Sequence, residues 1–408
     1  MPTEAAAILV FLLTYLAMAL GGIPGLRLDR AGAALAGAAA MVACGALSLE
    51  EAYRAIDLGT ITLLLGVMIV VASLRLSGVF ESACTWVAVR ARRPIVLLAA
   101  VVLVCGLCSA FLVNDAVCLV LTPLVCELTA RLERPPVPYL LAVAMAANVG
   151  SVATITGNPQ NIIIGSVSGI SYDRFAAHLA PVAGFGLLIV LALLVAVFHR
   201  EFWSRDLLRT QARTGAPAEA AADRPGVVKS VVVTLAMMAA FFAGWPPAAV
   251  AISAGAVMLI TRRIESRKLY AQIDWPLLAM FAGLFIVVAG LEKWVISARA
   301  DVLIGVMRLD RVATLSAVAV VLSNLVSNVP AVLVLRPFVA ALPDPTRAWL
   351  ALAMASTLAG NLTLVGSIAN LIVASGAASR GVKLGFWTYL KVGVPVTLLT
   401  VLVGILWL

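Results

Sequence analysis

Charged residues are scarce in this chain. Asp, Glu, Lys and Arg together make up 12% of its 408 residues, whereas apolar residues make up 63%, and the mean hydropathy is +1.08. Soluble domains are about one quarter charged and about half apolar. The shortage of charge excludes a soluble globular protein and a disordered chain, and long apolar runs recur almost from end to end. We therefore predict an all-α polytopic membrane protein.

Several kinds of chemistry also lack their characteristic residues. The chain has 2 histidines and 6 cysteines, and it contains no zinc-protease, nucleotide-loop or dinucleotide-binding pattern. Most of the cysteines fall in apolar stretches, where a cysteine usually packs as a small apolar residue. No histidine lies near the cluster at Cys105, Cys108, Cys118 and Cys126. We therefore expect no enzyme activity, no disulfide framework, no metal site and no cofactor.

Acidic residues are fewer than basic ones. The chain has 29 Lys and Arg against 20 Asp and Glu, a net charge of +9. In a membrane protein such an excess is explained by basic loops that stay on the cytoplasmic side, so we expect a lipid bilayer and no nucleic acid as the partner. The first apolar run follows Glu4 with no basic segment before it, so we expect it to remain as a span and not to be a cleaved signal peptide.

The apolar runs predict about ten transmembrane helices in two groups of five. A polar linker, residues 199–227, separates a first unit, residues 1–198, from a second, residues 228–408. The expected spans are residues 5–20, 31–47, 58–74, 137–165, 176–198, 228–243, 248–260, 275–291, 348–374 and 386–406.

Two longer apolar stretches, residues 94–126 and 312–342, are interrupted midway by polar residues. Each could be one long helix or a re-entrant hairpin. With two hairpins, most Lys and Arg fall on the linker side, whereas single crossings divide them almost evenly. We therefore favour ten spans plus two re-entrant hairpins in the cell inner (plasma) membrane, with the linker cytoplasmic and both termini outside. A third topology, in which each hairpin crosses the membrane fully twice, places every loop on the same side as the re-entrant topology. Charge counting does not distinguish these two topologies.

The two units resemble each other in sequence. Identical residues recur in the same order over more than half of each unit, with small insertions or deletions between blocks. Each unit has an odd number of spans, so the second copy is expected to lie inverted, as in secondary transporters. The matched pairs include Asp57 with Asp274, Gly66 with Gly283, Ser109 with Ser323, Asn114 with Asn328, Thr154 with Thr363, Gly157 with Gly366, and Asn161 with Asn370.

Four polar stretches, residues 109–115, 154–161, 323–330 and 363–370, interrupt the apolar runs in repeat-related pairs. Non-helical backbone at membrane depth is tolerated only where it is buried in protein or lines a wet cavity. We therefore predict that these stretches meet at a substrate- and ion-binding site. The candidate residues are Ser109, Asn114, Asp115, Thr154, Thr156, Gly157, Asn158, Asn161, Ser323, Ser327, Asn328, Thr363, Gly366, Ser367 and Asn370.

Asp115 is the most informative single residue. A carboxylate within the bilayer is costly and usually marks an ion or proton path. Its counterpart in the second unit is Val329, so the site is asymmetric. We predict Asp115 as the residue that carries the coupling proton; a structural helix cap is the alternative. The neutral amides and hydroxyls around it suit a small hydrogen-bonding solute.

The interruptions resemble motifs of the ion transporter superfamily, in the branch of arsenite efflux pumps and anion permeases with a citrate transporter-like domain. Asn114-Asp115, followed by an apolar run that ends in Thr122-Pro123, is similar to the first-hairpin signature of the arsenite pumps. Residues 327–330, Ser-Asn-Val-Pro, and residues 366–369, Gly-Ser-Ile-Ala, match later family motifs. Residues 156–161 look more like the anion permeases.

This resemblance implies a secondary transporter that works by alternating access, with its site between hairpin tips and broken helices. Sodium-coupled dicarboxylate carriers of the superfamily have Ser-Asn-Thr at both tips, which this chain lacks. We predict arsenite or antimonite efflux by proton antiport. The alternatives are a sodium-coupled anion or carboxylate carrier and a sodium/proton antiporter. The partners are then a small inorganic solute and a proton or sodium ion; a homodimer and an ATPase subunit stay open.

Overall fold

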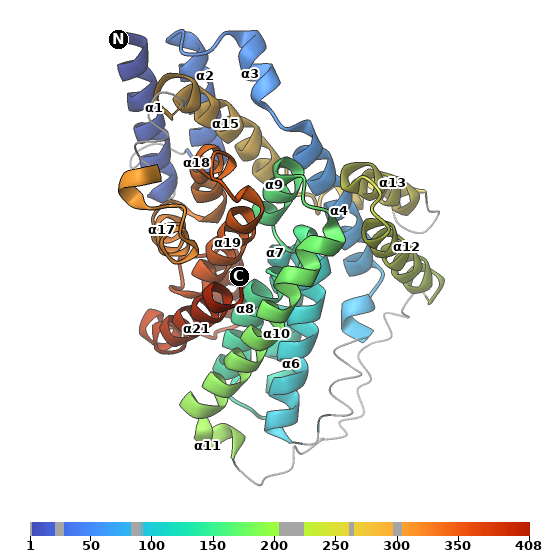
Figure 1. Ribbon diagram of the computed structural model, residues 1–408. Coiled ribbons are helices and arrows are strands. Elements are labelled where there is room, and N and C mark those ends of the chain that lie inside the picture. Colours follow the sequence, from blue (N-terminus) through green and yellow to red (C-terminus); the bar gives the residue numbers. More distant parts are fainter. Residues whose placement is uncertain are drawn as a thin grey trace.

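The computed structural model describes residues 2–20, 28–82, 91, 93–203, 224–260, 265–296 and 304–408, and every regular element among them is helical (Figure 1). Among the described residues, six helices are long and apolar enough to cross a membrane, and further apolar helices are shorter. The predicted all-α polytopic fold is therefore confirmed. Of the predicted linker, residues 204–223 lie outside the described residues.

The first half of the chain is built from a run of helices of very different lengths. They are α1 (Pro2–Ala19), α2 (Arg30–Ala43), α3 (Leu49–Ala55), α4 (Leu58–Leu76), α6 (Pro94–Phe111), α7 (Asn114–Arg131), α8 (Pro136–Ser151), the 3₁₀ turn η1 (Ile155–Gly157), α9 (Pro159–Ser168), α10 (Tyr172–Val197) and α11 (His199–Phe202). The predicted linker thus begins as helix α11.

The second half repeats this order. Its helices are α12 (Arg224–Phe242), α13 (Pro247–Leu259), α14 (Ser266–Tyr270), α15 (Trp275–Leu291), the π-helical turn η2 (Glu292–Ile296), α17 (Val312–Val326), α18 (Asn328–Ala340), α19 (Pro345–Leu358), the 3₁₀ turn η3 (Ala359–Asn361), α20 (Ile368–Ala378) and α21 (Phe386–Trp407). Helix α12 begins inside the predicted linker, before the expected start of the second unit.

The predicted interruptions lie where helices end. Residues 94–126 form two helices, α6 and α7, that meet at a short turn, and residues 312–342 form α17 and α18 in the same way. The expected spans 137–165 and 348–374 are each broken into a helix, a 3₁₀ turn and a second helix. The hairpins are thus present as helix–turn–helix pairs, and their re-entrant character stays a prediction.

The short helices α3 and α14 were not predicted. Each lies just before the long helix of its copy, α4 or α15. In α3, Ser48 accepts a hydrogen bond from the Glu51 amide, and the Glu51 carboxylate accepts one from the Ser48 amide, which completes a capping box. Both segments are mostly polar and lie outside the expected spans.

The two copies pack with matching contacts. Helix α4 of the first copy packs along α13 of the second, and α15 of the second packs along α2 of the first. A Cβ added to Gly66 would lie 2.4 Å from the carbonyl carbon of Ala251, and one added to Gly283 would lie 2.7 Å from that of Ala34. Gly66 corresponds to Gly283, and Ala34 corresponds to Ala251, at the same sequence offset. The same close Gly–Ala helix crossing therefore occurs twice.

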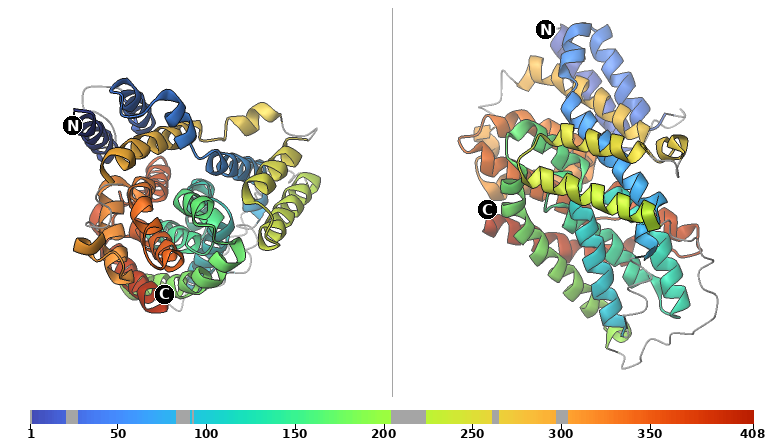
Figure 2. Two further views of the ribbon diagram at one scale, coloured as in Figure 1. Left: turned by 45° about the horizontal axis from the view of Figure 1, so that its top comes forward. Right: turned by 90° about the vertical axis from the view of Figure 1, so that its right-hand side faces the viewer.

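Two parts of the molecule position the site. Helices α6–α10 and α17–α21 form a central core, in which α7 contacts α20 and α9 contacts α18. Helices α1, α2, α4, α12, α13 and α15 form what we name the flanking layer, along one side of this core (Figure 2, left). The core carries all four interruptions, and α1, α2 and α15 of the flanking layer face the tip of the second hairpin.

Candidate functional site

The two hairpin tips place short polar side chains at helix N-termini. The first hairpin turns at Leu112 and Val113, so Asn114 and Asp115 open α7. The second turns at Ser327, and Asn328 opens α18. Ser327 has a positive φ of 81°, which few non-glycine residues adopt. The first amide groups of such helices have no partner within the helix and remain available to a ligand.

Each broken helix restarts at a polar cap. The Asn158 side chain accepts a hydrogen bond from the Asn161 amide at 2.9 Å, at the start of α9. The Ser367 side chain accepts one from the Ala369 amide at 3.2 Å, at the start of α20. Asn158 and Ser367 occupy the same position in the two copies. The helix restarts are therefore encoded by local capping residues in both copies.

Asn161 and Asn370 hold the two breaks open in the same way. Asn161 Nδ2 donates to the carbonyl oxygens of Ser151 and Thr154, at 3.1 and 3.0 Å. Asn370 Nδ2 makes the two equivalent bonds in the second break, at 2.7 and 3.1 Å. Buried carbonyls that lose their helical partner need another donor, because lipid supplies none. These two predicted residues therefore stabilise the unwound backbone.

Asn148, in α8, joins both copies at the centre of the molecule. Its Oδ1 accepts hydrogen bonds from Asn114 Nδ2 at 3.1 Å and from Ser367 Oγ at 3.2 Å. Its Nδ2 donates to Asn361 Oδ1 at 2.9 Å and to Asn370 Oδ1 at 3.0 Å. This one amide thus connects the first hairpin tip with the break of the second copy.

Thr357, in α19, has the corresponding role for the first copy. Its hydroxyl accepts hydrogen bonds from Asn158 Nδ2 and Gln160 Nε2, both at 3.1 Å, and donates to Asn161 Oδ1 at 3.3 Å. Thr357 and Asn148 occupy equal positions in the two copies. Each pre-break helix therefore binds the break of the opposite copy, and the duplication predicted from sequence is present in the hydrogen bonds.

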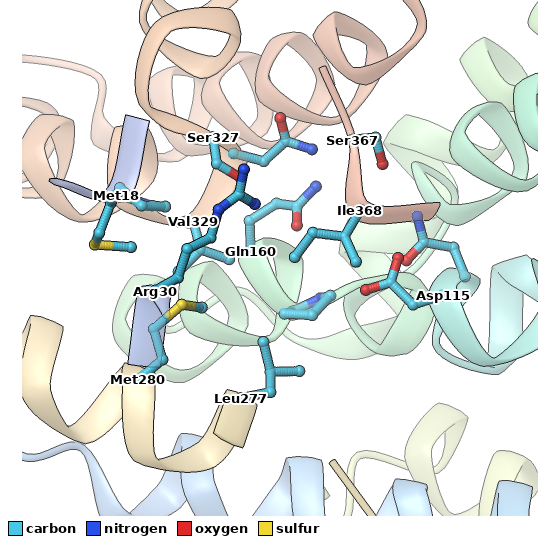
Figure 3. A pocket seen from close by; sticks show the side chains of 14 residues that line it. Met18, Arg30, Asp115, Gln160, Leu277, Met280, Ser327, Val329, Ser367 and Ile368 are labelled. Carbon is cyan, nitrogen blue, oxygen red and sulfur yellow. The ribbon is translucent and has the colours of Figure 1, made fainter. Parts of the chain in front are cut away.

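A cavity lies where the hairpin tips and the broken helices meet the flanking layer. Its volume is about 30 Å³, which is room for roughly two water molecules. Figure 3 shows Asp115 on one side, Gln160 and Ile368 in the middle, and Arg30 reaching toward Ser327 on the other side. The lining residues are Met18, Arg30, Asn114, Asp115, Pro159, Gln160, Leu277, Met280, Ser327, Asn328, Val329, Pro330, Ser367 and Ile368.

Two acceptor atoms at the cavity have no partner among the described residues. These are the side-chain oxygens Oδ1 of Asn114 and Asn328. The two residues are only 4% and 8% exposed. An unsatisfied buried acceptor costs free energy, so such atoms in a transport cavity indicate a place for a donor. The pair is repeat-related, one residue from each hairpin tip, and with the Asp115 carboxyl group it gives the cavity lining three acceptor groups.

Not all predicted site residues line this cavity. Asn114, Asp115, Ser327, Asn328 and Ser367 do so. The others lie behind it, in the breaks or along the hairpins; they are Ser109, Thr154, Thr156, Gly157, Asn158, Asn161, Ser323, Thr363, Gly366 and Asn370.

Several of these outer residues have structural partners. Thr154 Oγ1 donates to the carbonyl oxygen of Ala110, which joins the first break to the first hairpin. Thr156 Oγ1 and the Tyr172 hydroxyl are hydrogen-bonded at 2.8 Å. Thr363 Oγ1 donates to Asn324 Oδ1 at 3.4 Å. Their hydrogen bonds orient the elements that line the cavity.

The two glycines of the breaks are required by close packing. A Cβ on Gly157 would lie 2.2 Å from the carbonyl oxygen of Ser151, and one on Gly366 would lie 2.8 Å from Asn324 Oδ1. A side chain at either position would therefore require a shift of the backbone or of a hydrogen-bonded side chain. The glycines therefore shape the site without touching its contents.

Sequence reasoning missed several residues at this centre. Asn148 is 1% exposed within an Ala-rich helix, and a lone buried amide in an apolar run is the signal that could have identified it. Arg30 directly precedes the expected span 31–47 and was not a predicted site residue, although it opens α2 and lines the cavity. Gln160 lies inside the predicted 154–161 stretch without being a predicted site residue, and Thr357 and Asn361 lie shortly before the 363–370 stretch.

The sequence matches one family of known transporters. The model of the family described as "Citrate transporter" covers residues 9–359. The chain belongs to the citrate transporter family. The predicted membership of the ion transporter superfamily is thereby confirmed, as is the prediction that the chain is a transporter and not an enzyme.

Relatives of this citrate transporter family member match along nearly their whole length. A 46 kDa membrane protein of Mycobacterium leprae is 34% identical over 98% of each chain. The silicon efflux transporter LSI3 of rice is 30% identical over 94% of this chain and 93% of its own. The crystal structure of the YdaH transporter of Alcanivorax borkumensis superposes with a TM-score of 0.62, covering 99% of this chain and 97% of that one, at 15% identity. The fold is thus that of a multi-pass membrane transporter.

Proposed function

We propose that this transporter exports a small inorganic solute that carries hydroxyl groups, arsenite or antimonite first among them, in exchange for protons by alternating access. The observation that carries the proposal is the set of acceptors in the cavity lining, namely Asp115 and the unpartnered oxygens of Asn114 and Asn328. Arsenous acid has three hydroxyl donors and is neutral near pH 7. Three acceptors from both hairpin tips match such a solute.

The size of the cavity supports a small cargo. A volume of about 30 Å³ has room for roughly two water molecules, which is close to the size of a metalloid hydroxide. The rice relative is named a silicon efflux transporter, and silicic acid is likewise a small neutral hydroxide. Both facts agree with the arsenite-pump motif at Asn114 and Asp115.

Asp115 is proposed as the coupling residue. It is the only carboxylate among the described residues that line the cavity, and it belongs to the same tip as Asn114. A proton on this carboxyl group changes an acceptor into a donor and removes a negative charge. Solute binding and protonation can therefore exclude each other at one site, which is the requirement for antiport.

A second candidate is a sodium-coupled carrier of anions or carboxylates, or a sodium/proton antiporter. The match to the citrate transporter model and the Arg30 guanidinium at the cavity favour the anion version. The small volume of the cavity and the absence of Ser-Asn-Thr from both hairpin tips favour metalloid efflux over this second candidate.

Uptake into inverted membrane vesicles distinguishes these functions. With an imposed pH gradient and no sodium, we expect radiolabelled or mass-detected arsenite to accumulate and to saturate with concentration. Accumulation that depends strictly on sodium, or that occurs for citrate and not for arsenite, would support the second candidate and contradict the first. Vesicles without the protein are the baseline.

We also propose that the chain lies in the cell inner membrane with the 199–227 linker cytoplasmic and both termini outside. The excess of basic residues on the linker side supports this orientation. Labelling of single cysteines placed at residues 4 and 215 with a membrane-impermeant maleimide tests it: the first should react from outside and the second only after permeabilisation. The opposite pattern would reverse the topology.

A further inference from the structure

Arg30 is a cation at the cavity that the proposed transport chemistry has not used. It opens α2, and the adjacent N-cap Asp29 accepts a hydrogen bond from the Gly32 amide at 2.8 Å, so the helix end is capped without Arg30. The Arg30 side chain is half-buried and reaches toward Ser327 and Val329 at the second hairpin tip (Figure 3). It forms no hydrogen bond or ion pair with another described residue.

The remaining polar groups of the cavity are chiefly oxygen ligands. They comprise the Asp115 carboxylate, the side-chain oxygens of Asn114, Asn328 and Gln160, and the hydroxyls of Ser327 and Ser367. Hard cations are bound by carboxylate, amide and hydroxyl oxygens of this kind. The cavity therefore has the composition of a cation site, and the one cation that the described residues bring to it is a side chain.

We propose that Arg30 is the built-in monovalent cation of this site, and that it takes the electrostatic role that a bound sodium ion would otherwise have. Transport through the cavity then requires no sodium. The inference rests on the proposed function in one respect, that this cavity is the transport site. It goes further by assigning a role to a residue of the flanking layer and by excluding one coupling ion.

Charge repulsion gives the physical reason. Two unit charges about 6 Å apart, at an effective dielectric constant of about 20, repel each other enough to weaken binding roughly 100-fold. A sodium ion placed among the cavity oxygens in the presence of Arg30 would meet such a penalty. Without the guanidinium, the same oxygens would be left with a net negative charge and would attract a small cation.

A proton can bind where sodium is excluded. It forms a covalent bond to a carboxyl oxygen of Asp115 and needs no shell of oxygen ligands. The guanidinium, with its five donors in a rigid plane, can meanwhile hold an oxygen of the solute at the side of the cavity opposite Asp115. Arg30 and Asp115 thus act on the two ends of one small solute.

Four proteins test the proposal: wild type, Arg30→Gln, Arg30→Lys, and Arg267→Gln as a matched control. Arg267 is an exposed arginine on α14, outside the cavity. Arsenite uptake into proteoliposomes is driven by a pH gradient in choline chloride or in sodium chloride. For wild type, Arg30→Lys and Arg267→Gln, the uptake rate of each protein is expected to be the same in choline chloride as in sodium chloride. The uptake rate of Arg30→Gln is expected to be at least about tenfold lower than that of wild type in choline chloride. Sodium chloride is expected to restore part of this rate, and the restored rate should saturate with sodium concentration.

Sodium-dependent thermal stabilisation of the purified proteins gives a second readout that needs no transported solute. We expect sodium chloride, compared with choline chloride, to raise the melting temperature of Arg30→Gln and to leave the other three proteins unchanged. This separates the inference from the identity of the cargo, because it holds or fails even when arsenite is not transported.

Three results would overturn the inference. One is a wild type whose transport or melting temperature depends on sodium. Another is full activity of Arg30→Gln without sodium. The third is a folded Arg30→Gln that is inactive in both salts and is not stabilised by sodium. Should Arg30→Gln fail to fold, the sodium dependence of wild type and of Arg30→Lys decides the question.

Discussion

At the scale of the residue, the site depends on a few buried amides whose bonds cross between the copies. Asn114, Asn161 and Asn370 could be predicted from sequence, because amides in an apolar run rarely occur without a partner or a ligand. The different role of each amide could not be predicted. Which amide faces the cavity and which spans a helix break depends on rotamers and on the opposite copy. Asn148 was missed for the same reason, since its four partners come from elements distant in the sequence.

Asp115→Asn is expected to abolish proton-driven transport while expression and folding are retained. The amide keeps the shape of the side chain and cannot exchange a proton at the cavity. Uptake into inverted vesicles should fall to the level of vesicles without the protein. Asp173→Asn, at an exposed aspartate in the first turn of α10, serves as the control and should transport normally. Near-normal proton-coupled uptake by Asp115→Asn would refute the coupling role.

Asn148→Ala is expected to lower the free energy of unfolding by about 2–3 kcal/mol, since four hydrogen bonds are lost and interhelical bonds in membranes contribute roughly 0.6 kcal/mol each, with unsatisfied partners adding to the cost. Thermal unfolding in detergent measures the effect. Thr122→Val is the control, because Thr122 donates only to the carbonyl oxygen of Cys118 in its own helix, at 2.6 Å. Equal effects of the two substitutions would contradict a central role for Asn148.

At the scale of the element, the hairpins and breaks could be predicted because helix-breaking residues interrupt apolar runs at matched positions. Gly157-Asn158-Pro159 ends one helix and starts another by elementary backbone rules, and the structure has its break there. Helices α3 and α14 could not be predicted, since segments so short are stabilised by packing and capping more than by apolar periodicity.

Gly157→Ala is expected to destabilise the first break by about 3 kcal/mol or to displace α9, because the added methyl group would overlap the Ser151 carbonyl. Both the melting temperature and the transport rate should fall. Gly184→Ala, in α10, adds a methyl group with nothing within 4 Å and should leave both unchanged. A stable and active Gly157→Ala would show that the break is not held as described.

At the scale of the whole molecule, the duplication determines the architecture. Sequence matches predicted two copies, and the structure adds that each copy completes the other, through α4 with α13 and α15 with α2. This exchange could not be deduced from sequence, because apolar helix faces of similar composition do not specify their partner. The position of Arg30 could not be predicted for a related reason. A charge count assigns a residue to a side of the membrane, whereas the fold brings Arg30, at the start of α2, to the cavity lined by the second hairpin tip.

Gly66→Ala and Gly283→Ala test this two-fold construction. Each added methyl group would collide with the backbone of an Ala in the opposite copy, at 2.4 and 2.7 Å from its carbonyl carbon. We expect both variants to lose stability by a similar amount, about 1–3 kcal/mol, in thermal unfolding. A large loss for one and none for the other would indicate that the two junctions are not equivalent.

The central claim is that both hairpin tips line one cavity that binds a small hydroxyl-bearing solute. Thermal stabilisation of the purified protein, screened over arsenite, antimonite, sulfate, citrate and sodium, tests it most directly when wild type is compared with Asn114→Ala and Asn328→Ala. Arsenite or antimonite should raise the melting temperature of wild type, and each single substitution should remove the shift, although the two residues belong to different copies. Stabilisation by citrate or sulfate alone, or an arsenite shift that survives in both variants, would contradict the account.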